Sequence, residues 1–301
     1  MNKEIERVVE QASALGTGLL GLSYLDLSNG ETCSINGDVL FPIASVYKVF
    51  ILCELSRQLK MRKLSLSDRI ILQEADKVNG SGMLKNEKEG NEYSLRQYRD
   101  WMMQISDNTA SDYLLKLIRP ENVDRYIIRP TGLVKTHLDL SCREMIQRYY
   151  SISSGRIIDP VSGHERGNYR LNPYFACKAE KNNVTTPKEM QELMRCLYFG
   201  LVIDGETDRK ILDVMTGCEN NLRIPAGLPK ETRVAHKSGS LDHVGNDVGI
   251  VYTPDGDYVL SLFYNGNVAT EEEYLTSSWS QKATAVLSEI SREIYRARCG
   301  R

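Results

Sequence analysis

The first forty residues combine helical periodicity with strand-like runs. Apolar residues recur at helical spacing over 2–14, which predicts an amphipathic helix. The apolar run 19–27 is followed by Ser28-Asn29-Gly30 and by a second strand-like run over 31–40. Because Asn-Gly sequences favour tight turns, we expect the two runs to pair as a β-hairpin.

The middle of the chain has helical periodicity, interrupted once by a long polar segment. Thr186 followed by Pro187 is a typical helix start, because threonine caps the first turn and proline is tolerated at its first position. Between 141 and 187 the periodicity fades, and so long a segment without regular elements indicates a functional loop or an insertion. The predicted helices cover 46–59, 94–105, 110–118 and 187–199.

The end of the chain returns to strands and closes with a helix. Strand-like runs over 247–253 and 257–264 flank Pro254-Asp255-Gly256, a strong hairpin signal, and a shorter run covers 233–237. Apolar positions at helical spacing over 276–298 predict the closing helix.

Strands at both ends with helices between them predict an α+β fold, in which the two ends of the chain build one antiparallel sheet. We expect a sheet domain formed by residues 1–42 and 218–301. An all-helical domain is expected over residues 43–217, including an enlarged loop region at about 141–187.

Composition narrows the class of protein. The chain carries 38 Lys+Arg against 40 Asp+Glu, so no bulk field attracts nucleic acid or an anionic membrane. No apolar run approaches the roughly 18 residues that span a bilayer. The hydrophobic fraction of 41% suffices for a sizeable core. We therefore expect a monomeric globular protein with neither a nucleic-acid partner nor a membrane span.

The cysteines and histidines form no familiar metal or disulfide pattern. C-x-x-C and H-E-x-x-H are both absent from the sequence, so we expect no metal and no other cofactor. Seven widely spaced thiols are predicted to be mostly small buried residues and favour a reducing compartment. The charged first ten residues lack the apolar core of an export signal, which predicts a cytoplasmic protein unless a signal was trimmed, in which case it would work outside the cytoplasm. The cysteines are Cys33, Cys53, Cys142, Cys177, Cys196, Cys218 and Cys299.

Three short motifs carry candidate chemistry, and the first is Ser45-Val46-Tyr47-Lys48. Positions i and i+3 of a helix share a face, so the Lys48 amine can reach the Ser45 hydroxyl. A neutral lysine can take the hydroxyl proton if burial and a nearby cation lower its pKa from about 10.4 toward 7. The motif alone is weak, because a capping serine beside a solvated lysine gives the same pattern.

The second motif, Ser106-Asp107-Asn108, lies between two predicted helices. The Ser106 hydroxyl can relay a proton to a leaving nitrogen, and the Asn108 amide can orient a substrate. Helix capping explains these residue types equally well, since serine, aspartate and asparagine are preferred caps.

The third motif, Lys237-Ser238-Gly239, ends a short predicted strand and precedes Ser240. Lys237 would attract an anionic substrate and lower the pKa of Lys48. Gly239 would let a substrate lie against the strand edge. An ordinary strand end with a surface lysine is the alternative.

In their order and flanks, the three motifs together resemble those of the class A serine β-lactamases and the related penicillin-binding proteins. Phe41-Pro42 precedes the first serine, and Thr185-Thr186-Pro187 resembles the element that closes this family's Ω loop. The resemblance extends from Leu19 to the final helix. It implies a three-layer α/β/α arrangement and an acyl-enzyme mechanism. The substrate would be a small molecule, a β-lactam or a related amide or ester that carries a carboxylate.

The resemblance also implies which residues transfer protons. Ser45 would be the acylated nucleophile and Lys48 its base. Ser106 would pass the proton on to the leaving nitrogen.

Other residues would bind the substrate. Asn108 would hold the substrate's side-chain amide, and Lys237 and Ser238 would bind its carboxylate beside Gly239. The backbone N–H of Ser240, with that of the nucleophile, would form an oxyanion hole, whose donors are worth about 10²–10³ each in rate.

The sequence departs from the family at the residue that activates the deacylating water. The family has a glutamate in an E-x-x-L-N segment. The best match here is Asn168-Tyr169-Arg170-Leu171-Asn172, in which Asn172 fits the family asparagine and Asn168 replaces the glutamate. An amide cannot act as a general base, a role worth about 10²–10⁴ in rate, so we expect slow deacylation. The carboxylates that could serve instead are Glu144, Glu165 and Glu180.

A second departure is Asn246, where many family members have an arginine. Arg223 is a candidate substitute.

Three functional hypotheses follow. The first is a β-lactamase-like serine hydrolase that acylates Ser45 and then hydrolyses the ester. The second is a penicillin-binding or sensor-like protein that stays acylated or acts on another amide, ester or peptide, and Asn168 favours it. The third is a non-catalytic protein that retains only the fold, and the intact motifs argue against it.

Overall fold

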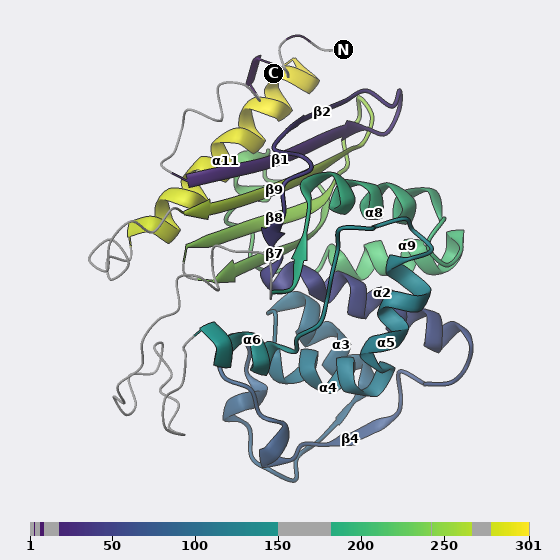
Figure 1. Cartoon of the computed structure of the whole chain (residues 1–301). Helices are drawn as coiled ribbons and strands as arrows, with labels where there is room; N and C mark the ends of the chain where they lie inside the picture. The colour runs from purple at the N-terminus through teal and green to yellow at the C-terminus, as the bar shows by residue number, and fades with distance from the viewer. Residues whose placement is uncertain are drawn as a thin grey trace.

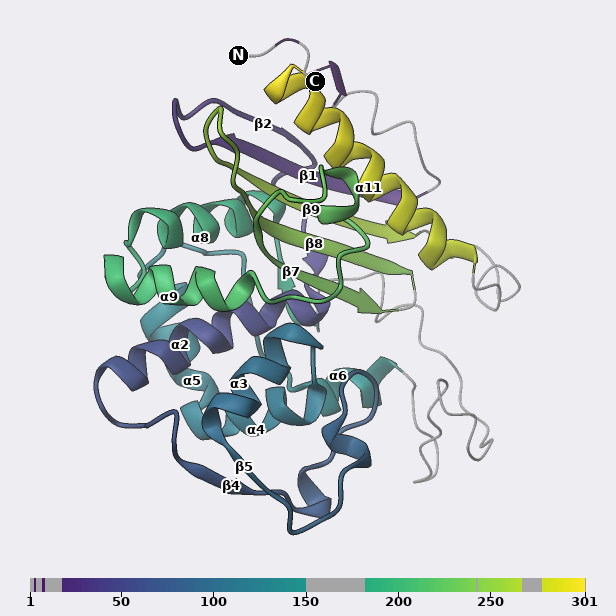
Figure 2. The ribbon, with the colours of Figure 1, turned by 180° about the vertical axis from the view of Figure 1, so that it is seen from behind.

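The computed structural model describes Lys3, Arg7, Val8 and residues 18–149, 182–241, 243–266 and 278–300. Within these ranges the chain forms one five-stranded sheet, with a long helix across one face and a helical region on the side of the other (Figure 1, Figure 2). The helix expected over 2–14 lies almost entirely outside the described residues.

The sheet combines strands from both ends of the chain, in the order β2-β1-β9-β8-β7 and antiparallel throughout. This confirms the predicted α+β fold with a sheet built from both termini. β1, from the first part of the chain, pairs with β9, from its last part. The two ends of the chain therefore lie side by side in the middle of the sheet. The strands are β1 (Gly18–Asp26), β2 (Thr32–Ile35), β7 (Val234–Leu241), β8 (Val244–Val251) and β9 (Tyr258–Gly266).

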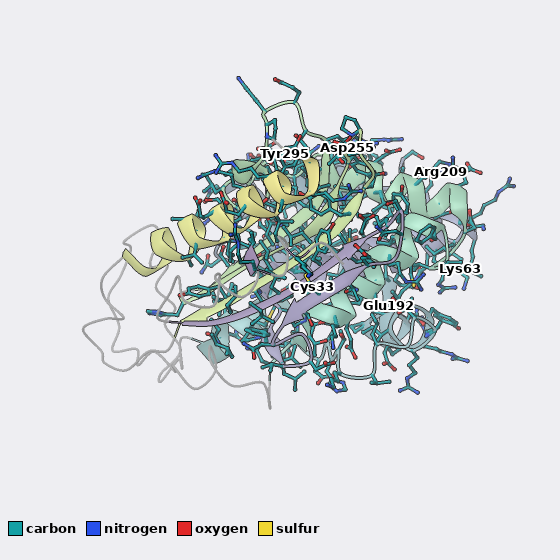
Figure 3. All side chains as sticks on the ribbon, turned by 90° about the horizontal axis from the view of Figure 1, so that it is seen from above. Cys33, Lys63, Glu192, Arg209, Asp255 and Tyr295 are labelled. Atoms are coloured by element: carbon teal, nitrogen blue, oxygen red, sulfur yellow. The ribbon has the colours of Figure 1, made fainter. Side chains whose placement is uncertain are left out.

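The two faces of the sheet bury separate apolar cores. Helix α11 (Ser278–Cys299) covers one face, where Leu287 and Ile290 share a buried cluster with Leu260 of β9. Figure 3 shows α11, which carries Tyr295, lying across the sheet, with Cys33 on the outer strand β2.

The opposite face of the sheet packs on the helical layer. There Val248 of β8 and Phe263 of β9 share a cluster with Phe50 of α2 and Met190 of α8. Alternate residues of each strand supply the two cores, as the pleat requires.

Local capping explains where the predicted helices begin. α3 starts at Ser94 with a full capping box to Gln97, and α4 is capped by the Asp107 carboxylate. The predicted helix 46–59 begins with a short 3₁₀ turn, η1, and continues as α2. The remaining elements are β3 (Phe41–Pro42), η1 (Ala44–Tyr47), α2 (Lys48–Lys60), β4 (Arg69–Ile71), η2 (Glu74–Asp76), η3 (Leu84–Asn86), β5 (Glu92–Ser94), α3 (Leu95–Gln104), α4 (Asn108–Ile118), α5 (Pro120–Val123), the π-helical η4 (Asp124–Ile128), α6 (Cys142–Tyr149), β6 (Val184–Thr185), α8 (Pro187–Phe199), α9 (Gly205–Met215) and η6 (Pro225–Gly227).

The prediction that residues 141–187 lack regular elements is wrong for the first part of this segment, because α6 begins at Cys142. The half-buried Asp112 carboxylate accepts hydrogen bonds from the N–H groups of Cys142 (2.6 Å) and Arg143 (3.0 Å), so a residue distant in sequence supports the first turn. A search for local periodicity cannot detect such support. Residues 150–181 are outside the described part of the chain. No helix in the described ranges has the length and apolarity needed to cross a bilayer.

The turn η6 packs closely against α11. A Cβ placed on Gly227 would lie 2.6 Å from Arg292 N and closer still to Ser288 O, both backbone atoms of α11. Any side chain at this position must push the helix away.

We therefore expect Gly227→Ala to lower the free energy of unfolding by about 1–3 kcal/mol, the usual cost of overpacking. Gly205→Ala is the matched control, because nothing lies within 4 Å of a Cβ at Gly205. Urea unfolding followed by circular dichroism measures both, and equal midpoints for the two variants would contradict the packing argument.

Candidate active site

The serine of the first motif lies in a tightly held turn that follows β3. Ala44, the residue before Ser45, has a left-handed backbone (φ 47°), which an alanine adopts only under constraint from its surroundings. The Asn246 amide supplies such a constraint by donating to the carbonyls of Pro42 (2.8 Å) and Ile43 (3.1 Å). Ser45 itself is half-buried at the start of η1.

The edge strand β7 passes against this turn. A Cβ on Gly239 would lie 3.0 Å from Ser45 N and 3.1 Å from both Ile43 O and Val46 N. The third motif therefore needs a glycine at this position, because the two backbones approach too closely for a side chain. The close approach brings the Lys237-Ser238-Gly239 strand beside the serine.

Lys48 is fully buried at the start of α2. Its ammonium donates to Ser106 O (2.6 Å), Ser106 Oγ (3.0 Å) and Asn108 Oδ1 (2.8 Å). Three acceptors match the three N–H donors of a charged lysine. The Ser45 hydroxyl is not among the three.

Burial lowers the pKa of Lys48, and the charges of nearby Asp107 and Asp112 act in the opposite direction. The hydrogen bonds thus hold the amine in place while desolvation makes it easier to deprotonate than a lysine in water. A buried amine of this kind can exchange a proton with the Ser106 hydroxyl beside it.

In the second motif Asp107 has a structural role, whereas Ser106 and Asn108 accept hydrogen bonds from Lys48. Asp107 is buried, and its carboxylate accepts hydrogen bonds from the N–H groups of Met83, Leu84 and Ala110, so it caps α4 and anchors a neighbouring loop. Ser106 has a left-handed backbone (φ 57°), and both its carbonyl and its hydroxyl reach Lys48. The Asn108 amide donates to Asn79 O (2.9 Å).

Lys237 is the second buried amine. Its Nζ donates to the carbonyl of Ser238 (2.9 Å), which is also buried. Burial lowers the pKa of Lys237 to about 8, and the charges of Lys48 and Arg223 contribute to this. The charge of Lys48 therefore disfavours the charged form of Lys237.

Arg223 is buried and binds the strand that carries the third motif. It donates to Gly239 O (3.0 Å), to Asn246 O (2.8 Å) and to Ser240 Oγ (2.7 Å). Arg223 thus ties β7 to β8 behind Ser240. Asn246, the position at which the resemblance predicts an arginine in many relatives, supports the turn before Ser45.

Sequence reasoning missed Cys142, which contacts the same polar cluster. Its thiol donates to Asn108 Oδ1 (3.3 Å) and lies 3.1 Å from Tyr47 Oη. Burial raises the pKa of this thiol to about 11, although the charge of Lys48 opposes the shift. Cys142 is therefore a neutral thiol at neutral pH.

The position of Cys142 follows from contacts at the start of α6. Asn183 pairs with both backbone groups of Leu140 (2.9 and 2.7 Å), which holds the segment just before the helix. Ser141 and Glu144 form a reciprocal capping box, with the Glu144 carboxylate bound to Ser141 N at 2.9 Å. The S-x-x-E spacing of this box was the available sequence signal for a helix that starts at Cys142.

Of the residues considered for deacylation, only Glu144 lies in the described part of the chain. Glu144 is exposed and used in the capping box, so the structure does not bring it to Lys48. Asn168 and Asn172 lie outside the described residues, as do Glu165 and Glu180. The structure brings the three motifs together from η1, α2, the start of α4 and β7. The residues that meet are Ser45, Lys48, Ser106, Asn108 and Lys237-Ser238-Gly239. The arrangement offers a half-buried hydroxyl, a relay hydroxyl and two buried amines at one sheet edge.

Known proteins resemble the chain over nearly its whole length. The model of the β-lactamase enzyme family matches residues 1–297. A β-lactamase of Rhodobacter capsulatus is 23% identical over 96% of this chain and 88% of its own length. β-Lactamase 3 of Bacillus cereus is 23% identical over 85% of this chain and 72% of its own.

Solved structures share the fold. A β-lactamase of Sphaerobacter thermophilus superposes with a TM-score of 0.78 at 26% identity, covering 99% of this chain and 98% of its own. PBP-A superposes with a TM-score of 0.76 at 21% identity, covering 98% of this chain and 95% of its own. Because the family match spans the motifs and the fold that joins them, the chain belongs to the β-lactamase enzyme family.

Proposed function

We propose that this protein is a serine hydrolase of the class A β-lactamase type, which opens a β-lactam ring by forming an ester at Ser45. The observation that carries the proposal is the buried Lys48 amine, hydrogen-bonded to the Ser106 hydroxyl at 3.0 Å one helical turn after Ser45. A group that shuttles protons must be held within hydrogen-bond reach of its partners and have a pKa near the working pH. The hydrogen bond to Ser106 supports the first condition, and burial, which lowers the pKa of Lys48, acts in the direction of the second.

The chemistry divides among three side chains. Lys48 in its neutral form takes the Ser45 proton as the hydroxyl attacks the lactam carbonyl. Ser106, in contact with the amine, passes a proton to the leaving nitrogen. The close packing of Gly239 on Ser45 N supports an oxyanion hole between that N–H and the N–H of Ser240.

The substrate in this proposal is a small molecule with a carboxylate. Lys237 and Ser238 would bind the carboxylate, since the buried ammonium is a strong point charge in a site with little water. Asn108, whose side chain is already bonded to Lys48 and to Asn79 O, would orient the substrate's amide at the rim of this cluster.

A second function, a penicillin-binding protein that stays acylated, is favoured by Cys142. The side chain that reaches Asn108 from α6, within the influence of the charge of Lys48, is a neutral thiol, where a carboxylate would supply a base for the deacylating water. A point mutant of PBP-A, 22% identical with a TM-score of 0.75, was solved as an acyl-enzyme complex with penicillin G. A long-lived ester at Ser45 would follow from the missing base.

Incubation with benzylpenicillin should add the mass of one antibiotic molecule to the protein. Ser45→Ala should abolish the adduct, because it removes the hydroxyl of the residue whose backbone N–H lies against Gly239. Intact-mass spectrometry measures this, with the exposed Ser67→Ala as control. An adduct that persists in Ser45→Ala would assign the chemistry to another residue.

Cys142→Glu should shorten the lifetime of the adduct by about 10²-fold or more, because a general base contributes about 10²–10⁴. Cys142→Gln is the matched control, with the same shape and no basic oxygen. The lifetime is followed by intact mass after excess antibiotic is removed. Asn168→Glu is measured in parallel, and acceleration there but not in Cys142→Glu would assign the water-activating position to residue 168.

The rate of acylation should fall above about pH 8. Lys237 is charged below its pKa of about 8 and neutral above it, so binding of the substrate carboxylate weakens as pH rises through this value. Stopped-flow measurement of the second-order rate constant from pH 6 to 10 tests this. Lys237→Arg, which keeps its charge throughout, should remove the decline. A wild-type rate that stays level from pH 7 to 10 would exclude Lys237 from carboxylate binding.

A further inference from the structure

The loop between η2 and η3, residues 77–83, lies against the second motif and supplies no group to the proposed reaction. Its backbone binds Asn108 twice. Asn108 N donates to Ser81 O (3.0 Å), and the side-chain amide donates to Asn79 O (2.9 Å). The Asp107 carboxylate holds the far end of the loop through two backbone N–H groups. The loop is therefore fastened to the residues that open α4.

Gly80 of this loop packs directly on the Asn108 amide. A Cβ at Gly80 would lie 2.7 Å from Asn108 Nδ2, closer than a side chain allows. The backbone of Gly80 is also left-handed (φ 91°), a conformation that favours glycine. The loop can approach the amide this closely only because no side chain stands between them.

These contacts set the direction of one N–H that is still available on Asn108. The amide oxygen accepts from Lys48 (2.8 Å) and from the Cys142 thiol (3.3 Å). One N–H of the amide nitrogen is used on Asn79 O. A primary amide has two N–H donors, and the second has no partner in the described part of the chain. Because the amide is planar, fixing its oxygen and one hydrogen also fixes where the second N–H points.

Arg143, in the first turn of α6, holds the near end of the loop. Its half-buried guanidinium donates to Ala75 O (2.7 Å) and to Lys77 O (2.9 Å). Its own backbone N–H is bound by the Asp112 carboxylate at 3.0 Å. Hydrogen bonds from a charged donor are stronger than those between neutral groups. Arg143 therefore joins α6 to the start of the loop, and the two lie side by side (Figure 1, Figure 2).

The Asn108 amide thus lies between α6 and the loop. Cys142 contacts the amide oxygen from α6, and the loop binds the amide nitrogen. Ile146 of α6 also comes within 3.6 Å of the position that a Cβ on Gly80 would occupy. Arg143 connects these two walls directly, so it sets the space in which the amide is held.

We propose that Arg143 is a positioning residue for substrate selection. Through the 77–83 loop it orients the free N–H of Asn108 toward an amide carbonyl on the substrate. The favoured substrates are then those with an acylamino group beside the reacting carbonyl, over those with a free amine there. Arg143 itself does not touch the substrate. The inference rests on the proposed function, because it concerns the selectivity of the same reaction.

The test compares two penicillins that share the ring system and the carboxylate. Benzylpenicillin carries an acylamino group, and aminopenicillanic acid has a free amine in its place. Arg143→Met, which keeps the length of the side chain but removes its donors, should lower the ratio of their second-order acylation rate constants by about three- to tenfold, the worth of one hydrogen bond. The constant for aminopenicillanic acid should stay nearly unchanged. Arg143→Lys, which restores a charged donor, should recover part of the ratio.

Gly80→Ala tests the same amide from the loop. Its added methyl group presses on Asn108 Nδ2, so this variant should also lower the ratio. Gly90→Ala is the matched control, because Gly90 has nearly the same backbone conformation (φ 88°) and nothing lies within 4 Å of a Cβ there. The control should keep the wild-type ratio. Since Gly80→Ala can fail to fold, Arg143→Met is the primary variant.

Equal slowing of both penicillins in Arg143→Met would overturn the proposal, because the residue would then support the fold and not the direction of the amide. A wild-type protein that acylates equally fast with both would overturn it as well. If neither penicillin acylates the wild-type protein, the proposed function fails, and substrate selection fails with it.

Hydrogen exchange followed by mass spectrometry distinguishes that failure from a failure of the Arg143 contact. Backbone exchange in residues 77–83 should be about tenfold or more faster in Arg143→Met than in the wild-type protein, because the loop loses two of its hydrogen bonds. Exchange that is unchanged in this loop would show that Arg143 does not hold it, and would overturn the proposal whatever the penicillins do.

Discussion

The burial of the Lys48 amine is the constraint on which the rest of the site depends. An ammonium removed from water must find acceptors for its protons, or its burial costs more than the fold can supply. Here the acceptors are Ser106 O, Ser106 Oγ and Asn108 Oδ1, all from the turn that opens α4. That turn can present two oxygens of one serine only because Ser106 adopts a left-handed backbone. The same contacts therefore satisfy the lysine and position the proposed relay hydroxyl.

Two aspartates hold this arrangement without taking part in the proposed chemistry. Asp107 uses its carboxylate on the N–H groups of Met83, Leu84 and Ala110, which fixes the turn that presents Ser106. Asp112 binds the first N–H groups of α6 and so directs Cys142 toward Asn108. Both carboxylates also act on Lys48 through their charge, which opposes the effect of burial on the pKa of the amine.

Two cysteines near the lysines illustrate how surroundings decide reactivity. Cys142 stays protonated because burial, which penalises its thiolate, outweighs the opposing charge of Lys48. Cys218 is similarly buried, yet the His236 imidazolium and the Lys237 ammonium reverse the outcome. The first thiol bears on how long an ester at Ser45 survives.

The sequence by itself determined the α+β fold with a sheet from both ends of the chain, because hydrophobic periodicity and turn residues are local signals. It also identified the three motifs, since their spacing is read directly from the chain. Only the tertiary structure revealed that Asp107 is a cap, that Asn246 supports the turn before Ser45, and that Cys142 reaches Asn108. Helix α6 escaped detection because part of its support comes from Asp112, thirty residues earlier in the chain. Contacts between distant residues leave no periodicity in the sequence, and they alone set the burial that shifts each pKa.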